Sequence, residues 1–318
     1  IMDCADQVMR GEALRRTQAD RLMQTDRHDV LFLTAAADRI RQVFCGDRMS
    51  FCADINARSG RCTEDCRFCA QSGYYHTGIR EYPLRQEDEL VKQAEAAESY
   101  GARRFGIVTS GRGQTDAEQF SHILSAVRKI RGRTHLQVCC SLGLLTDRQL
   151  AALRDAGAVR IHCNLETSES HFPCICTTHT YQDKVRHIRR IREAGLEVCS
   201  GGIIGLGETE QDRLDLAFAL KELDIASVPL NVFTPIEGTP FGKKKVLAPL
   251  DICRIFAVFR FILPRAVIRA CAGREKALRS LQSTALSSGL NGAMIGGYLT
   301  IRGGDPEGDR QMAADLGR

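Results

Sequence analysis

The chain is organised around Ser59-Gly-Arg-Cys62-Thr-Glu-Asp-Cys66-Arg-Phe-Cys69-Ala-Gln71, which places three cysteines at the spacing C-x3-C-x2-C. No secretion signal precedes them, so a metal site is expected rather than disulfides. A structural zinc site needs four closed ligands, and only His76 could supply the fourth. Three thiolates can instead hold three corners of a 4Fe–4S cube and leave one iron open to a substrate. The spacing therefore predicts an iron–sulfur site, with zinc or a purely structural cluster as alternatives.

The same spacing, with the aromatic Phe68 before the last cysteine, resembles the radical S-adenosylmethionine (radical SAM) superfamily. The resemblance implies that Cys62, Cys66 and Cys69 ligate a 4Fe–4S cluster. The open iron would bind the methionine amino and carboxylate groups of S-adenosylmethionine. One electron from the cluster would then cleave the sulfonium to a 5′-deoxyadenosyl radical.

Composition narrows the class of protein. The 318 residues carry a net charge of +5 with both signs interspersed, and no basic block indicates nucleic-acid binding. No apolar run is long enough to span a membrane. The N-terminus lacks an apolar signal core and carries acidic residues, unlike a transit peptide. Fourteen cysteines that must stay reduced predict a cytoplasmic location.

Hydrophobic patterning predicts a helical extension over residues 1–47 and one (β/α)8 TIM-type barrel over residues 48–318. In such barrels the functional residues lie at the carboxyl ends of the strands. The expected strands are Met49–Ile55, Arg104–Thr109, Leu136–Ser141, Val159–Leu165, Glu197–Ile203, Ser227–Val232, Ala266–Cys271 and Ala293–Ile295. The expected helices of the barrel lie near 86–100, 115–131, 146–156, 179–194, 209–223, 249–263 and 274–288.

Two further segments carry polar or glycine-rich patterns at strand ends. Gly201-Gly-Ile-Ile-Gly-Leu-Gly-Glu208 could be only a tight strand-to-helix connection. Beside the cysteine loop, it resembles the G-x-I-x-G-x-x-E element that lines adenine in the superfamily, which implies adenosyl contacts from Gly201, Ile203, Gly205 and Glu208. In the fourth strand, alternation places His162, Asn164 and Glu166 on one face. Buried polar groups need partners, so this face predicts a polar ligand or an internal hydrogen-bond network.

From about residue 49 to 318 the chain resembles the biotin synthase family, most specifically over Val198–Glu208. The resemblance implies insertion of sulfur between C6 and C9 of dethiobiotin by two adenosyl radicals and a sulfur-donating auxiliary cluster. It also implies a homodimer and a flavodoxin- or ferredoxin-type electron donor. The runs that carry it are Cys62–Ser72, Asn164-Leu-Glu-Thr167, Thr177-Thr-His-Thr-Tyr-Gln182, Val198–Glu208 and Arg269-Ala-Cys-Ala-Gly-Arg-Glu275.

Site residues follow from that resemblance. Asn164 and Glu166 would contact the ribose and the ureido ring, although the family usually has Asp at the position of Glu166. Cys139, Cys199 and Arg269 match ligands of the auxiliary cluster. His179 stands where an arginine is expected, which weakens its assignment to the S-adenosylmethionine carboxylate.

The family's strand-two cysteine is replaced by Gly106, so one thiolate ligand of the auxiliary cluster is missing. The segment Cys174-Ile-Cys176 follows the fourth strand, and residues i and i+2 of an extended chain share a face. We expect both thiols to complete the cluster, with Cys271 in reserve. Four thiolates suit a four-iron cluster with an extra sulfide rather than the usual 2Fe–2S form. The alternative for this segment is two incidental buried cysteines.

Two other functions stay open at this point. A sister radical SAM enzyme without sulfur insertion, such as a hydrogenase-cofactor maturase or a methylornithine synthase, would not need Cys139, Cys199 and Arg269 together. An iron–sulfur carrier would not need an open iron beside an adenine-type turn.

Overall fold

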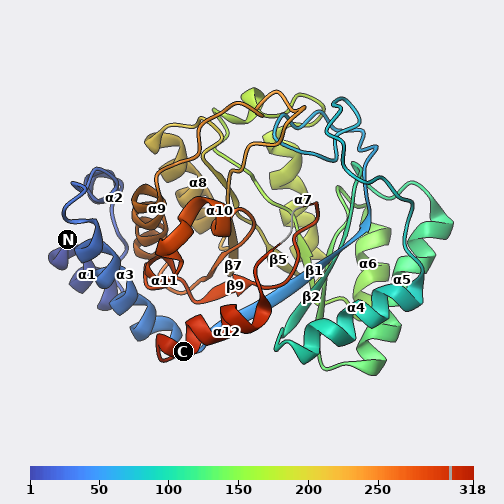
Figure 1. Ribbon diagram of the computed structural model, residues 1–318, viewed down its shortest axis with the longest axis horizontal. Helices are drawn as coiled ribbons and strands as arrows, with labels where there is room; N and C mark the ends of the chain where they lie inside the picture. Colours follow the sequence, from blue (N-terminus) through green and yellow to red (C-terminus); the bar gives the residue numbers. More distant parts are fainter. Residues whose placement is uncertain (301–302) are drawn as a thin grey trace.

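Parallel strands form a closed barrel in the computed structural model, which describes residues 1–300 and 303–318. The sheet order is β5-β4-β3-β2-β1-β9-β8-β7-β6, and a pairing between β5 and β7 closes the ring (Figure 1). β5 and β6 are two halves of the predicted fifth strand, so the prediction of a (β/α)8 barrel is confirmed. The strands are β1 Ser50–Arg58, β2 Arg104–Thr109, β3 Gln137–Ser141, β4 Arg160–His162, β5 Glu197–Cys199, β6 Gly202–Ile204, β7 Ser227–Val232, β8 Val267–Ala270 and β9 Gly292–Met294.

Helices surround the barrel, and several of them begin at side-chain caps. Thr146, Thr180 and Thr209 each accept a hydrogen bond from the backbone N–H three residues later, in capping boxes. Gly157 ends one helix in the left-handed conformation that glycine adopts without strain. The helices are α4 Glu87–Ser99, α5 Ala117–Arg133, α6 Asp147–Ala156, α7 Tyr181–Glu193, α8 Glu210–Glu222 and α9 Pro249–Ile262.

The last predicted helix, 274–288, is not continuous. It is divided into α10 Arg274–Leu278, a 3-10 turn at Arg279–Leu281 and α11 Gln282–Leu286. Arg279 has φ 53°, a left-handed conformation that an α-helix cannot contain, so the helix breaks there. α12 Pro306–Asp315 follows β9 and packs against α11.

The predicted N-terminal helical segment consists of α1 Met2–Met9, α2 Arg16–Met23 and α3 Val30–Cys45. α3 packs along α9, and Leu33, Ala37 and Ile40 are fully buried there (Figure 1). That residues 1–47 form a unit separate from the barrel stays a prediction.

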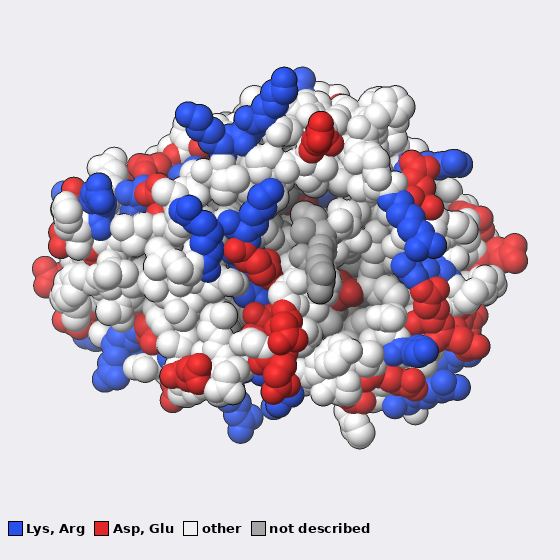
Figure 2. Space-filling model, viewed as in Figure 1, with Lys and Arg blue, Asp and Glu red and all other residues white. Residues whose placement is uncertain are grey.

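Basic and acidic side chains are interspersed over the face seen in Figure 2, which is hollowed near its centre. In the described part of the chain, no helix is both long and apolar enough to cross a membrane.

Candidate active site

The cysteine loop lies directly after β1, as predicted, and backbone hydrogen bonds fix its ends. Cys62 N–H donates to Gln71 O at 2.9 Å, and Gly73 N–H donates to Cys62 O at 2.8 Å. Cys62 Sγ also accepts from Gly111 N–H at 3.2 Å. Burial raises the pKa of Cys69 to about 11, so a free thiol here is protonated at neutral pH. Cys62, Cys66 and Cys69 thus lie on one short loop at the carboxyl end of the barrel.

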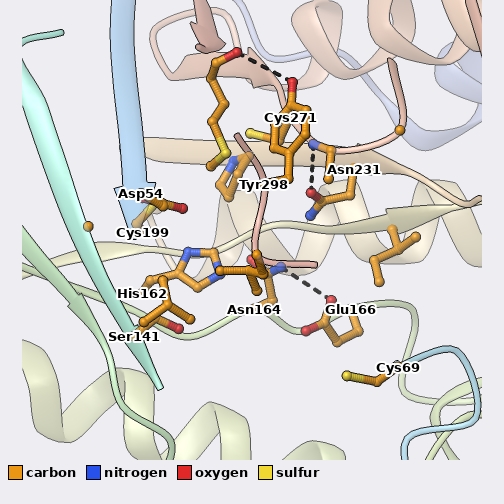
Figure 3. Close-up of a pocket in the computed structure, with 18 of the residues that line it drawn as sticks. Asp54, Cys69, Ser141, His162, Asn164, Glu166, Cys199, Asn231, Cys271 and Tyr298 are labelled. Atoms are coloured by element: carbon orange, nitrogen blue, oxygen red, sulfur yellow. Dashed lines mark hydrogen bonds between the residues drawn. The ribbon is translucent and has the colours of Figure 1, made fainter. Parts of the chain in front are cut away.

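Inside the barrel, a cavity of about 390 Å³ begins at this loop and is lined by residues from most strands. Figure 3 shows Cys69 at one end of the site, Cys199 and Cys271 away from it, and Asn164 and Glu166 between. Eight of the predicted site residues line this cavity: Phe68, Cys69, Cys139, Asn164, Glu166, Cys199, Ile203 and Arg269. All of them except Phe68 and Ile203 are polar or contain sulfur.

The polar face of the fourth strand is confirmed, although regular pairing in β4 ends at His162. Asn164 Oδ1 accepts from Gly201 N–H at 2.9 Å, and Asn164 Nδ2 donates to Glu166 Oε2 at 3.2 Å. Glu166 has φ 70°, a strained conformation for a side chain of this size, and its backbone bridges to Gly202. Asn164 therefore ties the Glu166 carboxylate to the glycine-rich segment while both face the cavity.

At the inner end, Cys139 on β3 and Cys199 on β5 lie near Arg269 on β8. Burial raises the pKa of Cys199, but a hydrogen bond and charge from His162, with the charges of Arg269 and Arg160, outweigh it and bring the pKa to about 7. Arg269 is 2% exposed and donates to the hydroxyls of Ser227 and Ser50 at 2.7 and 3.1 Å. The surroundings therefore favour the thiolate of Cys199, whereas burial raises the pKa of the neighbouring Cys139.

The Asp54 carboxylate fills the position that a cysteine side chain at Gly106 would need. A Cβ built there would lie 2.0 Å from Asp54 Oδ1, because this carboxylate on β1 occupies the space beside β2. Burial raises the pKa of Asp54, and the charges of His162 and Arg269 oppose that rise.

The glycine-rich segment agrees only in part with its predicted role. Ile203 lines the cavity, whereas Gly201, Gly205 and Glu208 do not. The Glu208 carboxylate accepts from Gly205 N–H and from Arg213 Nε, both at 2.7 Å. Glu208 therefore holds the turn in shape from outside the cavity. A Cβ on Gly201 would lie 1.9 Å from Pro229 O, so this glycine is required by close packing of main chains.

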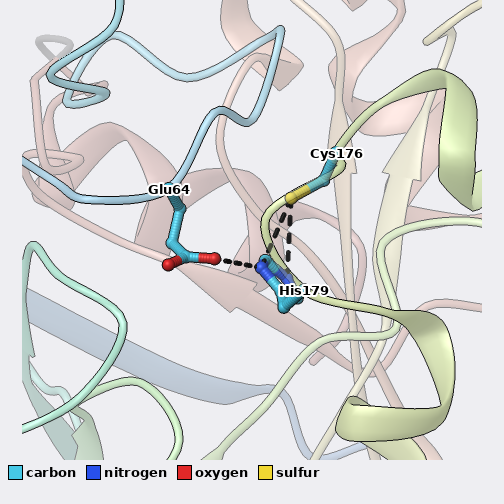
Figure 4. A group of neighbouring side chains, drawn as sticks. All are labelled: Glu64, Cys176 and His179. Carbon is cyan, nitrogen blue, oxygen red and sulfur yellow. Dashed lines mark hydrogen bonds and ion pairs between the residues drawn. The ribbon is translucent and has the colours of Figure 1, made fainter.

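The structure does not bring Cys174 and Cys176 to the cavity, and the expected shared face is wrong. A 3-10 turn at Phe172–Cys174 replaces the extended chain, so Cys174 is exposed while Cys176 is buried. Cys176 Sγ lies 3.3 Å from His179 Nδ1, and His179 pairs with Glu64 (Figure 4). A hydrogen bond with Cys66 and the neighbouring His179 lower the pKa of Cys176 to about 4 despite burial.

His179 likewise lies outside the cavity, held by Glu64 and Cys176. The nearby loop is fixed by the Asp65 carboxylate, which accepts from Thr177 N–H at 2.8 Å and Thr178 N–H at 3.2 Å. These contacts attach the segment after β4 to the cysteine loop.

Cys52 and Asp54, which lie in the first expected strand, were not among the predicted site residues. Both line the cavity, as does Cys271, which was held only in reserve. Alternation along β1 was the available signal, because Cys52, Asp54 and Asn56 place three polar or sulfur-bearing residues on one face.

Comparisons with known proteins agree with this geometry. Residues 57–220 match the Radical SAM superfamily and residues 229–318 match the Biotin and Thiamin Synthesis associated domain. Biotin synthase of Pelotomaculum thermopropionicum is 48% identical over 92% of this chain and 91% of its own length. Biotin synthase of Pelobacter propionicus is 46% identical over 100% of this chain and 97% of its own.

A solved structure of methylornithine synthase superimposes with a TM-score of 0.86 at 19% identity, covering 99% of this chain and 96% of its own. A structure of the hydrogenase maturase HydG gives a TM-score of 0.82 at 16% identity, covering 99% and 74%. At these identities the likeness shows the fold alone. The sequence relatives decide the family: the chain belongs to the biotin synthase family of radical SAM enzymes.

Proposed function

We propose that this protein is a biotin synthase, which inserts sulfur between C6 and C9 of dethiobiotin by radical chemistry from S-adenosylmethionine. The observation that carries the proposal is one cavity that is lined by Cys69 of the cysteine loop, by Asn164 and Glu166, and by Arg269. Cys62 and Cys66 lie on the same loop but outside the cavity lining. The identity of up to 48% over nearly the whole length of biotin synthases supports it.

The residues present fit the two iron–sulfur clusters that the family implies. Cys62, Cys66 and Cys69 offer three thiols on one loop, and Cys139 and Cys199 offer two more beside Arg269. When bound, the first cluster supplies the electron that cleaves S-adenosylmethionine, and the auxiliary cluster supplies the sulfur.

The side chains of the cavity would orient the substrates and exclude water. Asn164 and Glu166 offer a donor–acceptor pair for the ribose hydroxyls and the ureido ring of dethiobiotin. Phe68 and Ile203 give apolar walls beside the adenosyl group. Because the site lies inside the barrel, radicals formed there are shielded from solvent.

We infer that the auxiliary cluster is a four-iron cluster with an extra sulfide rather than the 2Fe–2S form. Gly106 cannot supply the usual thiolate, so the usual ligand set is incomplete. A homodimer, a flavodoxin- or ferredoxin-type donor and a cytoplasmic location also belong to this proposal and rest on the family resemblance and the cysteine content.

The test uses anaerobically reconstituted protein with a one-electron reductant, S-adenosylmethionine and dethiobiotin. We expect 5′-deoxyadenosine and biotin, and neither product from Cys62→Ala, Cys66→Ala or Cys69→Ala. Cys253→Ala is the control, because Cys253 is fully buried in α9 away from the cavity. If the protein converts another small molecule and forms no biotin, it is a sister radical SAM enzyme. If it binds iron but does not cleave S-adenosylmethionine, it is an iron–sulfur carrier.

A further inference from the structure

Six cysteines besides Cys69 line the cavity, and alternation turns Cys140 and Cys163 to the face opposite Cys139 and His162. The other four lie on or directly after four different strands. Cys52 lies on β1, Cys139 on β3 and Cys199 on β5, and Cys271 directly follows β8. All four are free thiols. Two of them, Cys52 and Cys271, have no counterpart in the ligand set that the family resemblance implies.

Strand register brings Cys52 and Cys271 to the same level of the barrel. Cys52 pairs with Met294 on β9, and Ala293 pairs with Ala270 on β8, so the next residue, Cys271, lies opposite Met294. Since side chains alternate along a strand, Cys271 shares its face with Arg269, which points into the cavity. The two extra thiols therefore flank β9 on either side.

Among the described residues, Cys52, Cys139 and Cys271 have only long contacts to main-chain oxygens, whereas Cys199 also interacts with His162. Cys52 Sγ lies 4.0 Å from Ala293 O, Cys139 Sγ 3.9 Å from Gln137 O and Cys271 Sγ 3.7 Å from Arg269 O. Cys199 Sγ lies 3.3 Å from Ser227 Oγ. Such contacts leave the sulfur atoms available as ligands.

No described carboxylate forms an ion pair with the guanidinium of Arg269, and burial of Asp54, which lines the same cavity, raises its pKa and so favours its neutral form. Arg269 reaches only neutral hydroxyls, and its Nε has no partner among the described residues. Arg104, which also lines the cavity, donates to Ser50 Oγ at 3.4 Å and likewise has an unpartnered Nε within the described ranges. A buried guanidinium without an anion is costly. An iron–sulfur core bound by four thiolates is net anionic, so it would supply the missing counter-charge.

We propose that Cys52, Cys139, Cys199 and Cys271 together hold the auxiliary iron–sulfur cluster, with Arg269 beside it as an anion-binding residue. The assignment rests on the proposed function and replaces Cys174 and Cys176 as the source of the extra thiolates. Cys52 and Cys271 supply, from β1 and β8, the ligation that Gly106 on β2 cannot. The planar fork of Arg269 suits an anionic sulfide better than it suits iron.

The test is metal analysis and Mössbauer spectroscopy on the anaerobically purified, reconstituted full chain. Variants Cys52→Ser and Cys271→Ser keep side-chain size, and a circular dichroism spectrum like that of the unmodified protein checks that each is folded. Each is expected to lose the iron, sulfide and spectral component of one cluster while keeping reductive cleavage of S-adenosylmethionine. Biotin formation should be lost in both.

Two controls make the result specific. Cys253→Ser alters a buried cysteine outside the cavity, and the Cys174→Ala, Cys176→Ala double variant removes the competing ligands. Both should keep the iron of two clusters. The proposal is overturned if Cys52→Ser and Cys271→Ser keep full iron and unchanged spectra, or if only the double variant loses the second cluster. Iron analysis does not depend on turnover, so it tests the cluster ligands separately from the activity. Failure of the unmodified protein to cleave S-adenosylmethionine would contradict the proposed function and leave the iron result to decide the ligands.

Discussion

The Asp54 carboxylate fills the position that a side chain on Gly106 would need, with Oδ1 only 2.0 Å from where its Cβ would lie. The two residues pair directly across β1 and β2, so a side chain at position 106 would require the Asp54 carboxylate, which lines the cavity, to turn aside. Asp54 on β1 therefore occupies the space that the absence of a side chain at Gly106 on β2 leaves open.

Gly106→Cys alone should destabilise the protein by about 1–3 kcal/mol through overpacking. Asp54→Ala combined with Gly106→Cys should recover most of this loss. Urea unfolding of the cluster-free, reduced protein measures the free energy of unfolding of the single and the double variant. Gly132→Cys is the control, because nothing lies within 4 Å of a Cβ at that helix position. Equal losses in the single and double variants would show that Asp54 is not the obstacle.

Glu208→Ala should cost about 3–5 kcal/mol, because it leaves the Arg213 guanidinium buried without its partner. In a double variant with Arg213→Ala, the total should fall short of the sum of the single losses. Glu210→Ala removes a more exposed ion pair with Arg254 and should cost less than about 1 kcal/mol. If Glu208→Ala weakened S-adenosylmethionine binding without changing the unfolding midpoint, a direct adenine contact would replace the structural role.

Asn164→Ala should lower kcat/KM for both S-adenosylmethionine and dethiobiotin, by roughly tenfold or more, since Gly201 N–H and Glu166 then lose a partner. Steady-state kinetics with each substrate varied in turn measures the effect. Ser168→Ala is a suitable comparison, because this buried hydroxyl bonds to Asp212 outside the cavity. Unchanged kinetics in Asn164→Ala would remove it from the site.

His187 should make the protein acid-sensitive. Burial lowers its pKa to about 4, so between the ordinary value near 6.5 and about 4 the unfolded chain binds a proton that the folded chain does not. Stability therefore falls as pH decreases through this window, by about 1 kcal/mol between pH 7.5 and 5.5. The His187→Gln variant should lose correspondingly less stability over the same interval, measured by urea titration at both pH values. Parallel losses in the two proteins would assign the acid sensitivity to other groups.

Sequence patterns predicted the barrel well because most strand residues are buried and several helices have clear capping signals, as at Thr146 and Gly157. The three loop cysteines could be assigned to one site because they are neighbours in the chain. Cys174 and Cys176 could not be placed, since the rule for residues i and i+2 holds only in extended chain and Phe172–Cys174 forms a 3-10 turn. Glu208 was assigned to the ligand because a motif does not reveal that Arg213, five residues later, would bind it.

The split between β5 and β6 is fixed by close packing of main chains. Gly201 and Gly202 admit no side chain, because their Cβ positions lie 1.9 Å from Pro229 O and 2.4 Å from Glu166 O. Neither glycine lines the cavity, so a substitution there would disturb the barrel without reshaping the site. The cavity surface is made of side chains such as Ile203, Met294 and Tyr298. Libraries that aim to admit a longer or differently shaped substrate should vary those side chains and leave the two glycines unchanged.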